Sequence, residues 1–186
     1  MKKILLIIVI VFCIFQMVVL AVAIDVGGEA IDRPDATTTN ATYIFKTNPA
    51  NASGVITSIE VWCNVSFEGF KVATFYKTNG NVFSTRDTHF IGTVVAGDKR
   101  IFSGLNININ EGDYLGCYFT NYPNGKHELN KTGGQGYWLL TGDYIPCTDT
   151  TFTLSGNSTY VHSVYGIGTT EVAEEEENVI FFGTNF

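Results

Sequence analysis

Turn residues recur through residues 41–168 and leave only short segments between them for regular structure. The intervals between turns are about 8 to 12 residues, a spacing typical of β-sandwiches and β-barrels. Asn79-Gly80 has the composition of a tight hairpin turn, and Ala96-Gly97-Asp98, Glu111-Gly112-Asp113 and Pro123-Asn124-Gly125 mark further reversals. No apolar period of 3.6 residues is sustained after residue 23, so the sequence predicts an all-β fold.

The segments between the turns are rich in β-branched and aromatic residues, which fit β-strands. We expect strands over residues 41–46, 55–65, 71–77, 81–90, 92–96, 99–102, 105–109, 114–120, 126–129, 137–141, 151–154 and 160–165.

Several of these strands alternate between apolar and polar residues. Leu105, Ile107 and Ile109 alternate with two asparagines, the pattern of a strand with one buried face. Two sheets are needed to cover so many one-sided strands, so we expect an antiparallel β-sandwich of jelly-roll or related Greek-key type. An immunoglobulin-like layout is the alternative, although no Trp follows Cys63 where that pattern would place one.

The N-terminus has the pattern of a secretory signal peptide. Lys2 and Lys3 precede an apolar stretch over residues 4–23, which ends in the small-x-small sequence Ala21-Val22-Ala23. This ending predicts cleavage and a mature start near Ile24. The alternative is an uncleaved membrane anchor, because roughly 20 apolar residues can span a bilayer. In either case we expect an exported protein that is extracellular or displayed at the cell surface, with membrane contact only through residues 4–23 if they are retained.

We therefore divide the chain into four parts: a signal peptide or anchor (1–23), a leader loop (24–40), a β-sandwich domain (41–168) and a tail (169–186). The tail contains an acidic run, Glu174 to Glu177, followed by apolar residues at 179–182. Repulsion between like charges favours an extended tail. The alternative is that residues 179–182 form a strand that pairs with this domain or with a neighbouring subunit.

The charge balance excludes one class of partner. Lys2 and Lys3 are two of the 11 basic residues, so the remainder of the chain has 9 bases against 18 acids. Nucleic-acid binding needs clustered Lys and Arg to meet the phosphates, and no such cluster occurs. We predict that nucleic acid is not a partner.

Three cysteines follow the N-terminal segment: Cys63, Cys117 and Cys147. An exported protein can form disulfides, but an odd number leaves at least one thiol free or paired between chains. Cys63 and Cys117 both fall on the apolar phase of their strands. This phase is compatible with a Cys63–Cys117 bridge and equally with two small buried side chains. Cys117–Cys147 is the competing pairing.

The sequence gives little support for catalysis. His89, His127 and His162 lie in separate predicted strands, and no G-x-S-x-G, H-E-x-x-H or phosphate-binding glycine loop occurs. Two carboxylates could in principle hydrolyse a glycoside. The acids at 60, 68, 111 and 128 mostly sit in or beside turns, where acids are common. We do not expect an enzyme.

Aromatic residues provide better candidates for a binding site. Flat rings stack on sugars, and loops on a rigid sandwich often carry such sites. The candidate ligand-contacting residues are Trp62, Tyr122, Tyr137 and Trp138. The alternative is that these rings are buried in a core or a subunit contact, as Tyr and Trp rings commonly are.

No cofactor or metal site is predicted, because no D-x-D-x-D-G motif occurs. The acids in oxygen-rich loops that structural calcium could use are Asp32, Asp35, Asp98 and Asp143. In a eukaryotic host, Asn-x-Ser/Thr sequons would permit glycosylation at Asn40, Asn51, Asn64, Asn130 and Asn157.

Residues 54–76, the Asn79-Gly80 hairpin and the stretch Leu105-Asn106-Ile107-Asn108-Ile109 followed by Glu111-Gly112-Asp113-Tyr114-Leu115-Gly116 resemble jelly-roll modules. Such modules occur in carbohydrate-binding domains and in viral or cell-surface proteins. The resemblance is one of fold and carries over no ligand residues.

From these observations we expect an exported β-sandwich binding module, carbohydrate-binding or adhesive, whose partners are glycans or further copies of itself. The alternative is a structural subunit of a surface layer, filament or virion, assembled through sheet edges and the apolar C-terminus. A glycoside-directed enzyme is the third hypothesis.

Overall fold

The computed structural model describes residues 21–37, 40–120, 125–155 and 159–170. These residues form antiparallel strands and no helix, which confirms the predicted all-β class. No helix among them is long and apolar enough to cross a membrane. The expected signal peptide or anchor up to residue 20 and the tail segment 171–186 lie outside the described residues.

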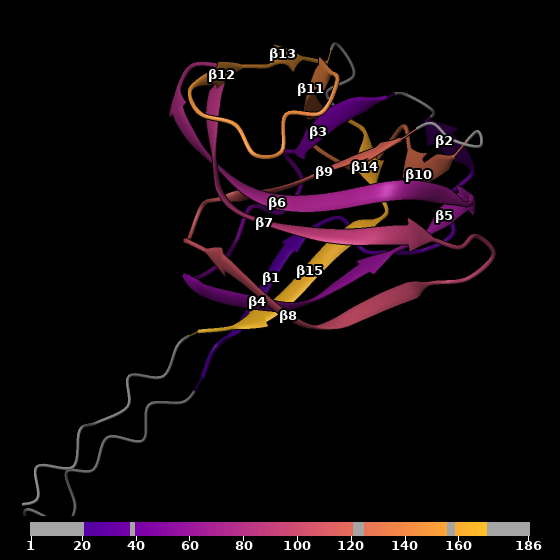
Figure 1. The fold of residues 1–186 in the computed structure, drawn as a ribbon, viewed down its shortest axis with the longest axis horizontal. Helices are drawn as coiled ribbons and strands as arrows, with labels where there is room; N and C mark the ends of the chain where they lie inside the picture. The colour runs from indigo at the N-terminus through magenta and orange to yellow at the C-terminus, as the bar shows by residue number, and fades with distance from the viewer. Residues whose placement is uncertain (1–20, 38–39, 121–124, 156–158, 171–186) are drawn as a thin grey trace, which may run out of the picture. The chain divides into compact units, whose positions relative to one another are not determined.

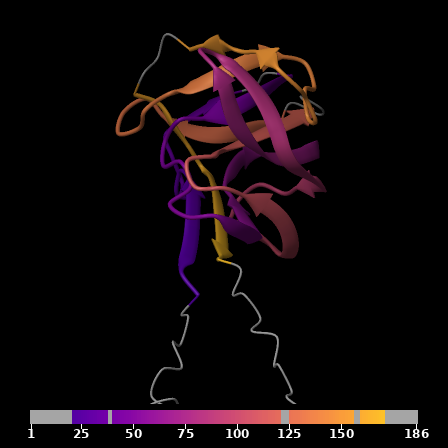
Figure 2. The same cartoon turned by 90° about the vertical axis from the view of Figure 1, so that its left-hand side faces the viewer.

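Four strands form one sheet in the order β1-β15-β4-β8. We call this the four-stranded sheet; its members are β1 (Ala23–Gly27), β15 (Val164–Thr169), β4 (Gly54–Val61) and β8 (Arg100–Ile109). Figure 1 shows it as the lower layer of the domain. Figure 2, turned by 90°, shows the first and last of the described strands, β1 and β15, side by side.

A larger sheet lies over it, and we call this the seven-stranded sheet. Its order is β12-β7-β6-β9-β3-β11-β13. The members are β12 (Thr150–Thr151), β7 (Val82–Val94), β6 (Phe67–Asn79), β9 (Tyr114–Thr120), β3 (Ala41–Phe45), β11 (Tyr137–Thr141) and β13 (Thr153–Leu154).

A small sheet completes the described fold. Its central strand is β10 (Lys126–Asn130), which pairs with β14 (Val161–His162), β2 (Asp35–Thr37) and β5 (Cys63–Val65).

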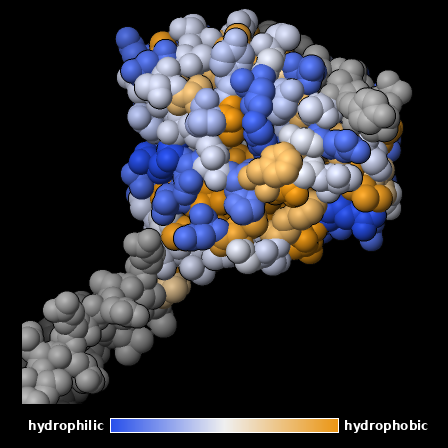
Figure 3. Space-filling model, in the orientation of Figure 1, coloured by the Kyte–Doolittle hydropathy of each residue, from blue (hydrophilic) through white to orange (hydrophobic). Residues whose placement is uncertain are grey.

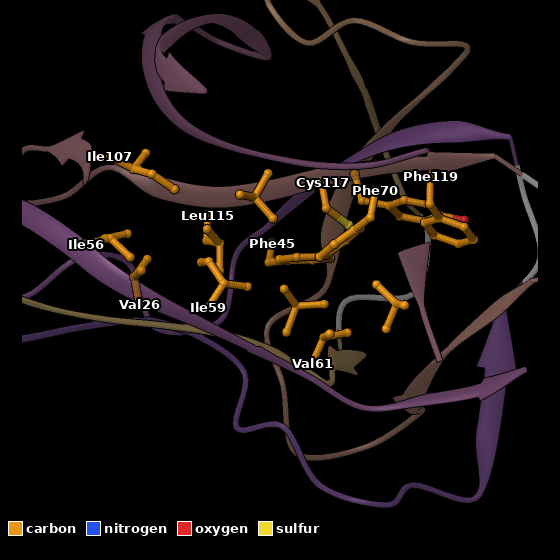
Figure 4. Close-up of a cluster of buried hydrophobic side chains, with 14 of the residues drawn as sticks. Val26, Phe45, Ile56, Ile59, Val61, Phe70, Ile107, Leu115, Cys117 and Phe119 are labelled. Carbon is orange, nitrogen blue, oxygen red and sulfur yellow. The ribbon is translucent and has the colours of Figure 1, made fainter. Parts of the chain in front are cut away.

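The main hydrophobic core is shared by the two larger sheets, in a β-sandwich-like arrangement. In Figure 4, side chains of the four-stranded sheet point toward side chains of the seven-stranded sheet. The former include Val26, Ile56, Ile59 and Val61, and the latter include Phe45, Phe70, Leu115, Cys117 and Phe119. The alternation expected in β8 is confirmed, because Ile107 and Ile109 are buried while Asn106 and Asn108 are exposed.

A second core covers the opposite face of the seven-stranded sheet. Alternate residues of a strand point to opposite faces, so Ile44, Ala73 and Tyr118 face away from the first core. The segment 142–153 crosses this face and contributes Ile145 and Phe152 to the second core. This outer face is therefore covered by the chain itself and is not an open groove.

The structure differs from the sequence prediction in how the segments are joined. The stretch 24–40, expected as a leader loop, contains β1 and β2. The expected breaks near Gly92 and Gly104 lie inside the long strands β7 and β8, where positive φ angles of 97° and 75° accompany shifts of register. A glycine in a strand can form a β-bulge instead of ending the strand.

The hairpin between β6 and β7 is also displaced by one residue from the predicted Asn79-Gly80. Asn79 pairs with Val82, so the two loop residues are Gly80 and Asn81. Gly80 has a φ of 51°. A type II′ hairpin needs such an angle at its first loop position.

Gly116 in β9 tests how tightly the two cores are packed. A Cβ atom at this position would overlap the carbonyl oxygen of Tyr43 and lie 2.6 Å from Phe75 Cε2. We expect Gly116→Ala to lower the free energy of unfolding by about 1–3 kcal/mol, the usual cost of overpacking. Urea denaturation measures it. Asn106→Ala is the control, because Asn106 is exposed on β8 and its change leaves both cores intact. Equal stability of Gly116→Ala and the wild type would contradict this packing.

Candidate functional site

A cavity of about 450 Å³ opens where β8 ends beside β7. It is lined by Ser53, Gly54, Arg86, Asn108, Ile109 and Asn110. Arg86 comes from β7, and Asn108 and Ile109 come from the end of β8. Gly54 is the first residue of β4, and Ser53 directly precedes it. We call this the β7–β8 pocket.

An ion pair forms the wall of this pocket. Asp113 is buried, and the Arg86 guanidinium binds it through two bonds: Nη2 donates to Oδ1 at 3.1 Å, and Nε donates to Oδ2. The backbone N–H of Asn110 donates to the same carboxylate at 2.9 Å. The hydrogen bond to Asp113 raises the pKa of Arg86, so the guanidinium stays charged. This two-bond geometry fixes the orientation of the guanidinium plane.

A second polar link joins β7 to the outer edge of β8. Asn108 donates to Asp87 Oδ2 twice, from its backbone N–H at 2.8 Å and from its side-chain amide at 2.9 Å. On the other side, Thr74 Oγ1 donates to the carbonyl oxygen of Asn108 at 2.7 Å. Both backbone groups of Asn108 thus have partners, and this part of the edge strand is closed to pairing with other chains.

Hydrogen bonds tie the loop after β8 to the segment before β4. Ser53 Oγ accepts a hydrogen bond from Glu111 N–H at 2.9 Å, and Ala50 exchanges backbone bonds of 2.8 and 2.9 Å with Asp113 and Gly112. The ring of Tyr76 lies beside the pocket wall, with its centroid 5.0 Å from Arg86 Cζ. The pocket therefore combines exposed amides, a hydroxyl and a fixed guanidinium, which can bond to both donors and acceptors of a ligand.

Of the sequence-predicted ligand residues, the three that the structure describes do not line this pocket. Trp138 is 3% exposed in the second core, and its Nε1–H donates to Asn81 Oδ1 at 3.0 Å. Tyr137, its neighbour in β11, points to the opposite face and contacts Tyr43. Trp62 is half-buried. Tyr122 lies outside the described residues.

The cysteines form neither of the two expected bridges. Cys63, Cys117 and Cys147 are free thiols. Cys117 belongs to the first core and Cys147 packs against the second, so the seven-stranded sheet separates them. Cys63 and Cys117 share the first core as small buried side chains, and burial raises the pKa of both thiols, to about 11 for Cys63.

The acids considered for calcium are scattered, and two of them pair with lysines. Asp35 bonds Lys131 at 2.7 Å, and Asp143 pairs with Lys71, while Asp32 and Asp98 are exposed. Among the described residues, no three His, Cys, Asp or Glu side chains are grouped as a metal site would require.

The sequons differ in accessibility. Asn40, Asn51 and Asn64 are exposed, Asn130 is half-buried, and Asn157 lies outside the described residues. Asn51 also closes the outer edge of β1, because its amide accepts from Asp25 N–H and donates to the carbonyl oxygen of Ala23, both at 3.1 Å.

Two histidines that are far apart in the sequence meet inside the domain. Leu129 pairs with His162 in the small sheet, which brings β14 beside β10. His127 Nε2 and His162 Nδ1 are 2.5 Å apart, and both rings are buried among aromatic side chains. Nothing in the sequence spacing indicated this pair, because it depends on the pairing of strands that bring together histidines 35 residues apart.

The histidine pair is neutral. Burial lowers the pKa of His127 to about 3, and burial, His127 and Arg33 together lower the pKa of His162 well below its ordinary value. A shared N–H···N bond between two neutral rings leaves one donor and one acceptor over. These are at His127 Nδ1 and His162 Nε2, which bond to none of the described residues.

Comparison with known protein families and with curated proteins finds no match to this chain.

The neutral pair predicts a loss of stability in acid. The unfolded chain takes up protons at these histidines below about pH 6.5, whereas the folded protein does not, so the free energy of unfolding falls as the pH falls. Each histidine contributes up to about 1.4 kcal/mol per pH unit well below its unfolded pKa, which amounts to about 3 kcal/mol for the pair between pH 6.5 and 5. Urea denaturation across this range measures the loss.

The double variant His127→Leu/His162→Phe should remove this part of the pH dependence, because both orphaned nitrogens are replaced together. His89→Gln is the control, since His89 lies on β7, outside the pair. An unchanged pH slope in the double variant would show that other groups cause the acid sensitivity.

Proposed function

We propose that this protein is an exported β-sandwich binding module of jelly-roll or related Greek-key type that binds a neutral carbohydrate in the β7–β8 pocket. The main support is the pocket itself, whose polar groups are fixed by the Arg86–Asp113 pair before any ligand arrives. Preorganised polar groups bind tightly because little ordering is left to occur on binding.

The electrostatics of the pocket favour a neutral ligand over an anion. The negative charge of Asp113 balances the positive charge of Arg86. Asp87, which follows Arg86 in β7, adds a second negative charge close to the guanidinium. The pocket thus offers hydrogen-bonding capacity without a surplus of positive charge. Asn108, Asn110 and Ser53 match hydroxyl groups, which both donate and accept, and the volume lies within the range of small-molecule sites.

A structural subunit is the second candidate, supported by exposed hydrophobic residues. Phe90 on β7 and Ile101 on β8 are 64% and 57% exposed, and Val95 in the connecting loop is also exposed. Figure 3 shows hydrophobic residues gathered on the face over β7 and β8. Apolar residues of this kind occur in contacts between copies. A mature protein that stays monomeric at high concentration would argue against this candidate.

Asn110→Ala tests the carbohydrate proposal. Its side chain lines the pocket and is exposed, so the change removes ligand contacts while leaving the backbone bonds to Asp113 in place. We expect the affinity for a neutral saccharide selected from a glycan array to fall by about 10-fold, the equivalent of one or two hydrogen bonds. Calorimetry on the selected saccharide measures the change.

Asn106→Ala is the matched control, because Asn106 is an exposed asparagine on β8, four residues before Asn110, and lies outside the pocket lining. It should bind as the wild type does. Equal loss in both variants, or no binding to any neutral saccharide across the array, would refute the proposed site.

A further inference from the structure

Two alanines near the start of β1 could each end a cleaved signal peptide. Signal peptidases need a small residue directly before the cut, and both Ala21 and Ala23 qualify. The sequence pattern alone favours a cut after Ala23. The fold distinguishes the two positions, because the residues between them are part of the domain.

Val22 and Ala23 are bonded into the four-stranded sheet. Ala23 is the first residue of β1 and pairs with Thr169 of β15. The Val22 N–H donates to Thr170 Oγ1 at 2.9 Å, and the Thr170 N–H donates to the carbonyl oxygen of Val22 at 3.0 Å. A cut after Ala23 would remove these bonds together with the contact between Asn51 and the Ala23 carbonyl group.

The new α-amino group also favours the earlier position. A cut after Ala23 would create an ammonium group on Ile24, whose side chain is 0% exposed in the first core and whose backbone lies in the β1–β15 ladder. A cut after Ala21 would place the ammonium group on Val22, which is 53% exposed. Removing a charge from water is costly unless it is fully paired, so the domain tolerates a charged start at Val22 better.

We propose that the leader is cleaved between Ala21 and Val22, and that the mature protein begins at Val22. The cut leaves Ala21 in the position before the bond and Val19 two residues earlier, both compact aliphatic side chains. This inference rests on the export that the proposed function includes, but not on the ligand.

The test is the N-terminus of the exported protein. The full chain is produced with its own leader in a secreting host, and the mature form is examined by intact mass and N-terminal sequencing. We expect a start at Val22. A start at Ile24 would overturn the proposed position. Retention of the leader on the exported protein would overturn cleavage itself, and a failure of export would contradict the proposed function as well.

Ala23→Phe separates the candidate cuts, and Ala21→Phe tests whether the small residue at position 21 is needed. Ala23→Phe places a bulky residue before the later bond only, so processing to Val22 should continue, and a block would show that the cut follows Ala23. Ala21→Phe places the bulky residue before the earlier bond and also two residues before the later one, so it should abolish the Val22 start without yielding an Ile24 start. If either variant fails to export, the start of the wild-type protein still decides between the two positions.

Discussion

The site depends on the polar links that join β6 and β7 to the end of β8 and to the loop after it. The two larger sheets share a core, but β8 has a backbone partner only in β4, among the described strands. Arg86, Asp87 and Thr74 reach across this margin to Asp113 and Asn108. Each neutral bond contributes only about 0.5–1.5 kcal/mol net, whereas leaving a buried carboxylate such as Asp113 unpaired costs about 3–5 kcal/mol. The Arg86–Asp113 ion pair therefore stabilises the end of β8 and the loop after it more strongly than the neutral hydrogen bonds do.

The same polar links determine which hydrogen-bonding groups are exposed at the β8 edge of the four-stranded sheet. They satisfy both backbone groups of Asn108, which would otherwise offer part of an open strand edge. They also hold the guanidinium and the loop 110–113 in place around a cavity. The hydrogen bonds that occupy the backbone groups of this sheet edge therefore also form part of the polar pocket.

The pocket lies at the end of the four-stranded sheet where the chain enters and leaves the domain. Ala23 pairs with Thr169, Thr169 with Val55, and Val55 with Asn108. With strands spaced by about 4.8 Å, Asn108 is about 10 Å from Thr169. The proposed mature N-terminus at Val22 would therefore lie near the pocket.

Features that depend on local residue chemistry could be predicted from the sequence, such as turns and the buried faces of strands. Features that depend on which strands lie side by side could not. The alternation of Ile107 and Ile109 with asparagines and the composition of the turns predicted an all-β fold and the buried face of β8. Gly92 and Gly104 were expected to mark the ends of strands, because glycine is common in turns. Glycine also forms β-bulges, and both residues lie at bulges inside longer strands. The pocket residues Arg86 and Asn110 carry no motif, and only the approach of β7 to β8 brings them together. Trp138 was a candidate ligand residue because its ring could stack on a sugar. The ring is buried instead, because the segment 142–153 covers the outer face of the seven-stranded sheet.

The most direct test of the proposed site is a ¹H–¹⁵N correlation spectrum of the mature domain, titrated with the saccharide that binds best on an array. Shift changes should concentrate at the amides of Ser53, Gly54, Asn108 and Asn110 and at the Arg86 side chain, which line the pocket. Shift changes confined to other strands, or an unchanged spectrum at saturating saccharide, would contradict the assignment of the β7–β8 pocket as a carbohydrate site.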